Sequence, residues 1–183
     1  MGRIFATILA CLTALVVLAT CTAAVLDAGH IFSQIKPNDH ETTMAVVEVR
    51  NGTAIADQQW VERLSSPSTS LNVTVTRPAL LVAFWWGDGT TGTTHNATPN
   101  NGFTVIDSLT IDSSLIQCIV ATKSVTAGTY NVTWTSESGE GAQLWLVAVD
   151  EPAGSGTPAL GGHTLAWHIH GTGGTTLTTS PIT

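Results

Sequence analysis

The feature that most restricts the fold of this chain is a repeated alternation of apolar and polar residues. Two stretches, Ser70–Arg77 and Thr129–Ser136, place apolar side chains at every second position with Asn, Thr or Ser between them. Successive side chains of a β-strand point to opposite faces, so each stretch predicts a strand with one buried and one wet face, as in antiparallel sheets. The residues predicted to face inward are Leu71, Val73, Val75, Tyr130, Val132 and Trp134.

Other stretches are apolar almost throughout, which predicts strands in the middle of their sheets. Turn sequences such as Asn51-Gly52 and Ala127-Gly128 separate them, and no stretch after the N-terminal segment has a helical period. Many short strands with such turns predict an all-β fold, a two-sheet antiparallel β-sandwich of Ig-like or jelly-roll type, over residues 41–151. The apolar runs are Thr43–Arg50, Ala79–Trp86, Ser114–Lys123 and Ala142–Asp150, and weaker strands are predicted over Gln58–Leu64 and Phe103–Asp107.

The first 24 residues have the pattern of a secretory signal peptide. Arg3 gives a short positive start, residues 4–26 carry no charge, and small residues around Ala24 suit cleavage. Two alternatives stay open: an uncleaved apolar run of about 20 residues can anchor a chain in a bilayer, and Leu18–Cys21 resembles a lipoprotein box, from which Thr20 departs. Each version predicts a secreted or cell-surface protein that meets a membrane only through this segment.

The remainder divides into a lead-in over residues 25–40, the sandwich, and a Gly/Pro-rich linker or loop over residues 152–162. Residues 163–183 then read as one strand and a Thr/Gly tail, which either completes the sandwich or opens a second domain.

Charge argues against nucleic acid as a partner. Only 10% of the 183 residues are charged, against about 25% in an average soluble domain. Without Arg3, five basic residues face thirteen acidic ones, a net charge of −8. Binding to nucleic acid depends on basic groups that neutralise phosphates, so we expect a surface of uncharged polar residues and an extracellular partner.

Four segments, taken in order, resemble a recurrent β-sandwich module of bacterial secreted, surface and phage-tail-associated proteins. They are LLVAFWWGDG (Leu80–Gly89), NGFTVIDS (Asn101–Ser108), KSVTAGTYNVTW (Lys123–Trp134) and AQLWLVAV (Ala142–Val149). The resemblance implies the sandwich fold for residues 41–151. It implies no catalytic residues, because such modules share none.

The adjacent residues Trp85 and Trp86 end an apolar run and precede a Gly/Thr-rich loop. They point to opposite faces of a strand. The face that carries Trp86 is bulkier, so we expect Trp86 in the core and Trp85 more exposed. An exposed indole beside Asp88 and His95 predicts a site where a sugar stacks on the ring; the alternative is that Trp85 packs under the loop.

Two histidines, His168 and His170, are predicted to project from one face of a C-terminal strand. Such a pair can supply two imidazoles to a metal ion, but a usable site needs a third ligand, for which His163, His95 or Asp88 is available. The alternative is a solvated strand face that carries two histidines, and no other cofactor is expected.

Four Asn-x-Thr triplets mark acceptors for N-glycosylation if the host uses them. They begin at Asn51, Asn72, Asn96 and Asn131. Cys118 is expected to be a buried small hydrophobe, because it shares a strand face with Ile116 and Val120.

No sequence motif supports catalysis: the chain has no Gly-x-Ser-x-Gly elbow and no Gly-rich phosphate loop. We therefore expect an exported, non-enzymatic β-sandwich that acts as a binding or structural module, with a glycan, a protein or a second copy as partner. The alternatives are a carbohydrate-binding module that uses Trp85 and the 87–101 loop, a metal-binding protein that uses His168 and His170, and a subunit of an extracellular filament.

Overall fold

A computed structural model describes residues 24–26, 29–37, 41–63, 70–88, 97–111, 116–135, 141–154, 156–169 and 179–182. Side chains are described from Thr43 onward, apart from those at positions 63, 88, 111, 116, 141, 168 and 169 within these ranges. Every regular element in this part of the chain is a β-strand, and none of it is a helix that could cross a bilayer. Apart from Ala24, the predicted export segment lies outside the described residues.

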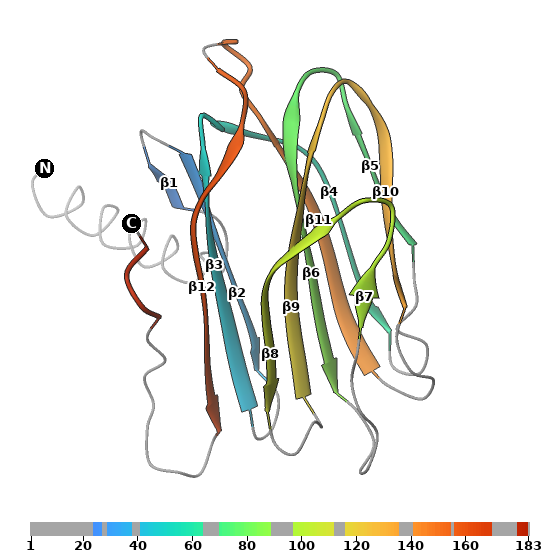
Figure 1. The fold of residues 1–183 in the computed structure, drawn as a ribbon, viewed down its shortest axis with the longest axis vertical. Helices are drawn as coiled ribbons and strands as arrows, with labels where there is room; N and C mark the ends of the chain where they lie inside the picture. Colours follow the sequence, from blue (N-terminus) through green and yellow to red (C-terminus); the bar gives the residue numbers. More distant parts are fainter. Residues whose placement is uncertain are drawn as a thin grey trace, which may run out of the picture.

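The strands form three antiparallel sheets, which stand side by side in Figure 1. The four-stranded sheet has the order β1 (Ala24–Leu26), β2 (Gly29–Pro37), β3 (Glu41–Arg50) and β12 (Ala159–Ile169). The five-stranded sheet has the order β4 (Ala54–Arg63), β11 (Gly141–Asp150), β6 (Ala79–Asp88), β9 (Ile116–Val125) and β8 (Thr104–Ile111). The three-stranded sheet has the order β5 (Ser70–Val75), β10 (Gly128–Thr135) and β7 (Thr98–Pro99).

The five-stranded sheet is the middle layer, because it contributes to two separate cores. Leu81, on one face of β6, packs with residues of β5 and β10. Val82, on the other face, packs with residues of β3. The all-β, antiparallel prediction is confirmed, but the described strands form three sheets where two were predicted. Strands that are apolar on both faces, such as β6, need a covering layer on each side.

The alternating stretches lie where their pattern predicts. Leu71, Val73 and Val75 of β5 are buried, whereas Asn72 and Thr74 are exposed. In β10, Val132 and Trp134 are buried and Tyr130, nearer the strand's start, is half-buried. The three-stranded sheet thus has one apolar face toward the middle layer and one wet outer face.

The outer edge of β5 is closed by side chains of β4. The Asn72 amide N–H donates to Gln59 Oε1 at 2.6 Å, and the Thr74 amide N–H donates to Asp57 Oδ2 at 2.7 Å. Unpaired amides on a strand edge are a template for pairing with another chain. Asp57 and Gln59 occupy the acceptor positions that a further strand would fill.

The last described strand, β12, pairs with β3 from Ala159 to Ile169, with a register shift between Leu160 and His163. At this register shift the side chain of Glu48 of β3 replaces a main-chain acceptor: its Oε2 accepts the Gly162 amide N–H at 2.8 Å. This hydrogen bond holds the pKa of Glu48 below its usual value. The segment after the Gly/Pro-rich stretch therefore belongs to the same set of sheets as β3.

Candidate functional site

The tryptophan pair is buried on both sides of β6. Trp85 is 0% exposed and Trp86 is 1% exposed, so the prediction that Trp85 is the exposed member is wrong. The reason is that β6 is an inner strand of a sheet that is covered on both faces. An indole with no exposed surface offers no face to a sugar. The side chain of Asp88 and the whole of His95 lie outside the described residues.

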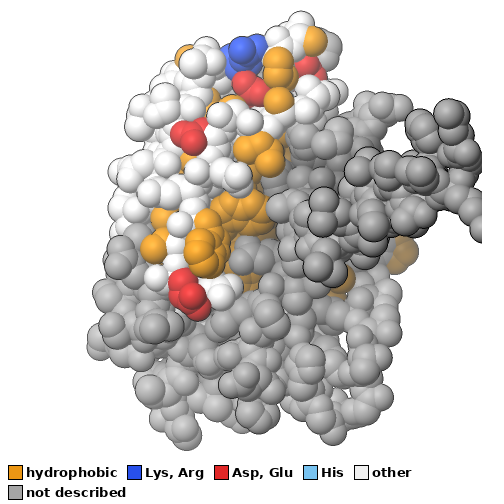
Figure 2. Space-filling model, turned by 180° about the vertical axis from the view of Figure 1, so that it is seen from behind, with side chains coloured by type: hydrophobic (Ala, Val, Ile, Leu, Met, Phe, Trp, Pro, Cys, Tyr) orange, Lys and Arg blue, Asp and Glu red, His pale blue; other side chains and the backbone are white. Residues whose placement is uncertain are grey.

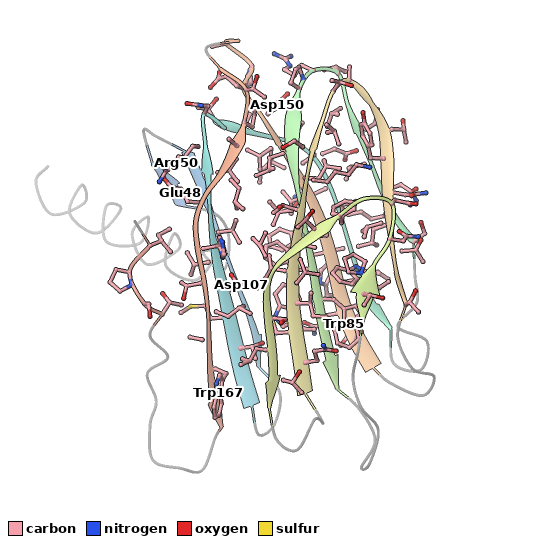
Figure 3. All side chains as sticks on the ribbon, viewed as in Figure 1. Glu48, Arg50, Trp85, Asp107, Asp150 and Trp167 are labelled. Atoms are coloured by element: carbon pink, nitrogen blue, oxygen red, sulfur yellow. The ribbon has the colours of Figure 1, made fainter. Side chains whose placement is uncertain are left out.

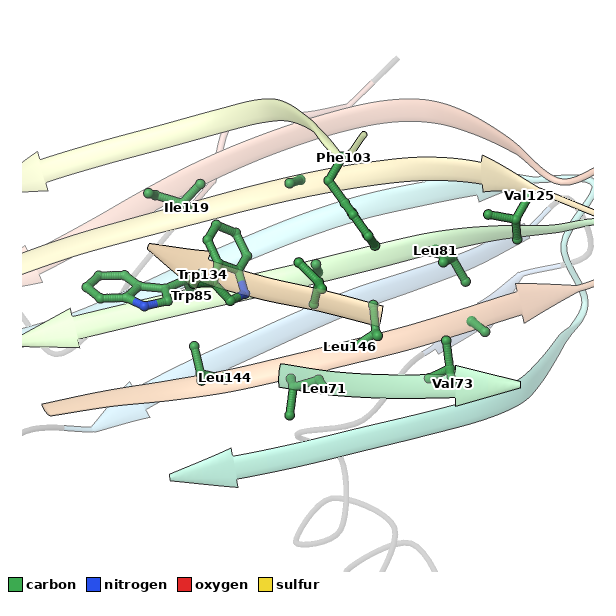
Figure 4. Packing of buried hydrophobic residues seen from close by; sticks show 14 of the residues in the cluster. Leu71, Val73, Leu81, Trp85, Phe103, Ile119, Val125, Trp134, Leu144 and Leu146 are labelled. Atoms are coloured by element: carbon green, nitrogen blue, oxygen red, sulfur yellow. The ribbon is translucent and has the colours of Figure 1, made fainter. Parts of the chain in front are cut away.

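Trp85 lies flat against its own strand. A Cβ atom at Gly87 would lie at most 2.5 Å from three ring carbons of Trp85, so only glycine fits beneath the indole. Figure 3 places Trp85 inside the sheets, and Figure 4 shows its ring next to that of Trp134 at one end of the core. Neither indole N–H has a hydrogen-bond acceptor among the residues that the structure describes. The pair therefore packs through its ring surfaces.

Of the four histidines named as candidate metal ligands, only His163 has a described side chain. Its Nδ1 lies 2.7 Å from Asp107 Oδ2, so His163 links β12 of the four-stranded sheet to β8 of the five-stranded sheet. The side chain of His168 and the whole of His170 lie outside the described residues. No group of three metal-ligating side chains occurs among the residues that are described, and the metal site stays a prediction.

Three of the four predicted glycan acceptors are described, and all three are exposed: Asn51, Asn72 and Asn131. Asn72 and Asn131 are direct cross-strand partners in β5 and β10. Asn96 lies outside the described residues. Glycosylation at these positions stays a prediction.

A site that the sequence did not indicate lies on the edge strand β4 and its neighbour β11. Trp60 is 54% exposed, the most exposed large hydrophobic side chain of the described part of the chain. Its cross-strand partner is Trp145, which is half-buried. β4 lies toward the back of Figure 1, and Figure 2, seen from behind, shows hydrophobic side chains gathered in a strip among mostly uncharged atoms, with acidic side chains beside it.

Trp145, the cross-strand partner of Trp60, is the last ring of a row of three stacked aromatic side chains. Trp86 and Phe84 stack with ring centroids 5.0 Å apart, and Phe84 and Trp145 stack at 5.4 Å. Trp86 and Phe84 are buried and Trp145 is half-buried, so the row begins in the core and ends beside the exposed Trp60. Aromatic rings prefer offset-stacked or edge-to-face packing, and the stacked rings give Trp145 a rigid support.

Polar side chains flank these rings on the same sheet face. The Trp145 indole N–H donates to Gln58 Oε1 at 3.2 Å, and Gln143 Nε2 donates to Glu62 Oε1 at 3.4 Å. Both amides keep further donors and acceptors, and Glu62 keeps its second oxygen. We call Gln58, Trp60, Glu62, Gln143 and Trp145 the aromatic strip.

One signal in the sequence could have indicated Trp60. In Gln58–Glu62 the residues that share its strand face are Gln58 and Glu62, so a large ring stands on an otherwise polar face. The sequence does not indicate that Trp145 belongs to this site, because Trp145 lies opposite Trp60 only through the register of β4 on β11.

No protein-family model, curated protein or solved structure matches this chain. The resemblance to the bacterial β-sandwich module stays a prediction, and the function must be inferred from the geometry of the site.

Proposed function

We propose that this protein is an exported, non-enzymatic β-sandwich of Ig-like or jelly-roll type that binds a neutral saccharide on the aromatic strip. The observation that carries the proposal is the exposed ring of Trp60, whose cross-strand partner Trp145 ends a stacked aromatic row. A free indole face packs against the C–H face of a pyranose, and side chains around it bind the hydroxyl groups.

The polar residues of the strip favour a saccharide over a protein partner. Gln58 and Gln143 each offer both donors and acceptors, and Glu62 offers acceptors only. Sugar hydroxyls need this mixture, because each donates and accepts. A neutral saccharide also avoids repulsion by the carboxylate of Glu62 within the strip.

The strip supports binding rather than hydrolysis. Glu62 is its only carboxylate, whereas glycoside hydrolysis ordinarily uses two carboxylates that flank the scissile bond. The next acid on β4, Asp57, lies on the opposite face of the strand, where it accepts the Thr74 amide N–H. The strip therefore lacks a general acid to pair with Glu62.

Retention on immobilised polysaccharides and on a neutral glycan array tests this proposal. We expect the wild-type protein to be retained, and Trp60→Ala to weaken binding about tenfold or more, because a stacked aromatic is a typical binding hot spot.

A matched control is Trp167→Ala. Trp167 is also exposed, at 45%, but lies on β12, and Figure 3 places it near the far end of that strand. It should leave retention unchanged. The proposal is wrong if the wild-type protein binds no saccharide, or if the two variants lose binding equally.

A further inference from the structure

A polar hollow of about 460 Å³ lies beside β10 on the three-stranded sheet. We call it the β10-edge hollow. It does not include any residue of the aromatic strip, so a ligand in the hollow does not depend on whether the strip binds a sugar. Its lining residues are Asn72, Asn101, Lys123, Thr129, Tyr130 and Asn131.

Lys123 of β9 is fixed in the wall of this hollow. Its Nζ donates to the Asn101 carbonyl oxygen at 2.6 Å and lies 5.4 Å from the centre of the Tyr130 ring and 5.9 Å from that of Phe103. One hydrogen bond leaves two of the three ammonium hydrogens for other acceptors. Two aromatic rings hold the charge in place.

The ammonium of Lys123 has no carboxylate partner among the described residues. Arg50 lies 3.3 Å from Glu48 Oε2, and Arg77 lies 3.1 Å from Asp150 Oδ2. Lys123, which is half-buried, instead contacts a carbonyl oxygen and two rings. A partly desolvated positive charge among neutral groups attracts an anion more strongly than a fully hydrated one does.

The edge of β10 that faces away from β5 is partly closed by the turn at Asn100 and Asn101. The Asn131 carbonyl oxygen accepts a hydrogen bond from Asn101 Nδ2 at 3.3 Å, and Thr133 exchanges two hydrogen bonds with Asn100. Main-chain groups alternate in direction along a strand, so those of Thr129 also point out from this edge. The Asn101 side chain also binds Asn131 Oδ1, which fixes both amides.

We propose that the β10-edge hollow binds an acidic sugar, with its carboxylate on Lys123 and its hydroxyl groups on the surrounding amides. A single ammonium balances one carboxylate, whereas a phosphate dianion would leave one charge uncompensated. The asparagine, threonine and tyrosine groups match a ligand that carries several hydroxyls, since each amide both donates and accepts. A hexuronate has this combination.

The test is a titration of ¹⁵N-labelled protein, made in a host without N-glycosylation, with D-glucuronate, D-glucose and acetate. We expect glucuronate to shift the side-chain amide signals of Asn72, Asn101 and Asn131, and D-glucose and acetate to bind about tenfold more weakly or not at all. Lys123→Gln should weaken glucuronate binding about tenfold or more, because a hydrogen bond to a charged group is lost. Lys123→Arg should retain most of the affinity.

Two further variants separate binding from folding. Asn72→Ala changes an exposed side chain in the hollow's wall and should also weaken glucuronate binding. Arg50→Gln removes a surface cation outside the hollow and should leave binding unchanged. The inference is overturned if wild-type protein binds no glucuronate, if glucose binds as well, or if Lys123→Gln binds normally. Trp60→Ala should not affect this titration, so the strip and the hollow can fail separately.

Discussion

Replacing Gly87 with alanine tests how Trp85 is buried. The substitution adds one methyl group to the strand face on which the Trp85 ring lies, at most 2.5 Å from three ring carbons. Gly87 does not have a positive φ, so alanine meets no backbone strain there. The effect on the free energy of unfolding therefore comes from the clash alone.

The size of this clash gives the expected magnitude. Carbon atoms in contact lie about 3.5 Å apart, so the indole must move by at least about 1 Å. Trp85 is 0% exposed and packs beside Trp134, so it has no free space to enter. Overpacking costs up to about 3 kcal/mol, and the lower entropy of the unfolded alanine chain offsets about 0.7 kcal/mol. We expect a net loss of about 2 kcal/mol, or a Tm lower by about 4–8 °C for a domain of this size.

Urea unfolding of four proteins checks this value: wild type, Gly87→Ala, Trp85→Leu and the double variant. Trp85→Leu is destabilised by its own cavity, but it removes the ring that the new methyl group meets. In the Trp85→Leu background only the effect on the unfolded chain remains, so Gly87→Ala should stabilise by about 0.7 kcal/mol, which gives a coupling energy of about 3 kcal/mol. Additive losses, or a Gly87→Ala protein as stable as wild type, would refute this account of Trp85.

Two other predictions concern the β5 edge and the free thiol. Asp57→Ala with Gln59→Ala exposes the Asn72 and Thr74 amides, so we expect a loss of about 2 kcal/mol and more dimer or aggregate by size-exclusion chromatography. Gln58→Ala also removes a hydrogen bond of β4, the one to the Trp145 indole, but leaves the β5 amides covered, so it is the control for association, and equal dimer or aggregate in both proteins would contradict the role of the edge. Burial raises the pKa of the Cys118 thiol, so alkylation mapped by mass spectrometry should modify Cys118 only in denaturant, and rapid labelling of the folded protein would contradict its burial.

The sequence predicted strands best where all side chains on a strand face were apolar or all were polar. The alternation in β5 and β10 predicted their buried residues correctly, because a half-buried strand shows its two faces directly. The apolar runs at β6, β9 and β11 were predicted to be central, and they are the inner strands of the middle sheet. Cys118, predicted to be a buried hydrophobe, is 0% exposed.

The exposure of the tryptophans could not be predicted in the same way. The prediction that Trp85 is the more exposed of the pair assumed that only one face of β6 packs against a core. In the structure each face of β6 packs against its own core, so Trp85 and Trp86 are both buried. Trp60 is exposed because β4 is an edge strand, and the position of a strand within its sheet depends on pairings with distant segments. β2, Gly29–Pro37, was not predicted, since its sequence does not alternate regularly.

The arrangement of the layers explains why both proposed binding surfaces lie at strand edges. An inner strand of the middle sheet has no exposed side chain to offer when both of its faces are covered, as β6 shows between Ala79 and Gly87. The most exposed contacts then come from an edge strand such as β4, or from the gap beside a short partner such as β7, and inner strands such as β11 and β9 add only half-buried side chains. The aromatic strip uses the first kind of position and the β10-edge hollow uses the second.

The scarcity of charge makes each charged side chain informative. Only 10% of the residues of the chain are charged. In its described part, most charged side chains contact another residue directly: Arg50 contacts Glu48, Arg77 contacts Asp150, Asp107 contacts His163, and Asp57 binds the edge of β5. A cation whose role was only to fasten the turn at Asn101 could be replaced by a neutral donor at lower desolvation cost. Lys123 instead keeps a positive charge between two rings with no carboxylate beside it among the described residues. The hydrogen bond to Asn101 satisfies one hydrogen of the ammonium and leaves its charge without a counter-charge, which is the physical reason for proposing an anionic ligand there.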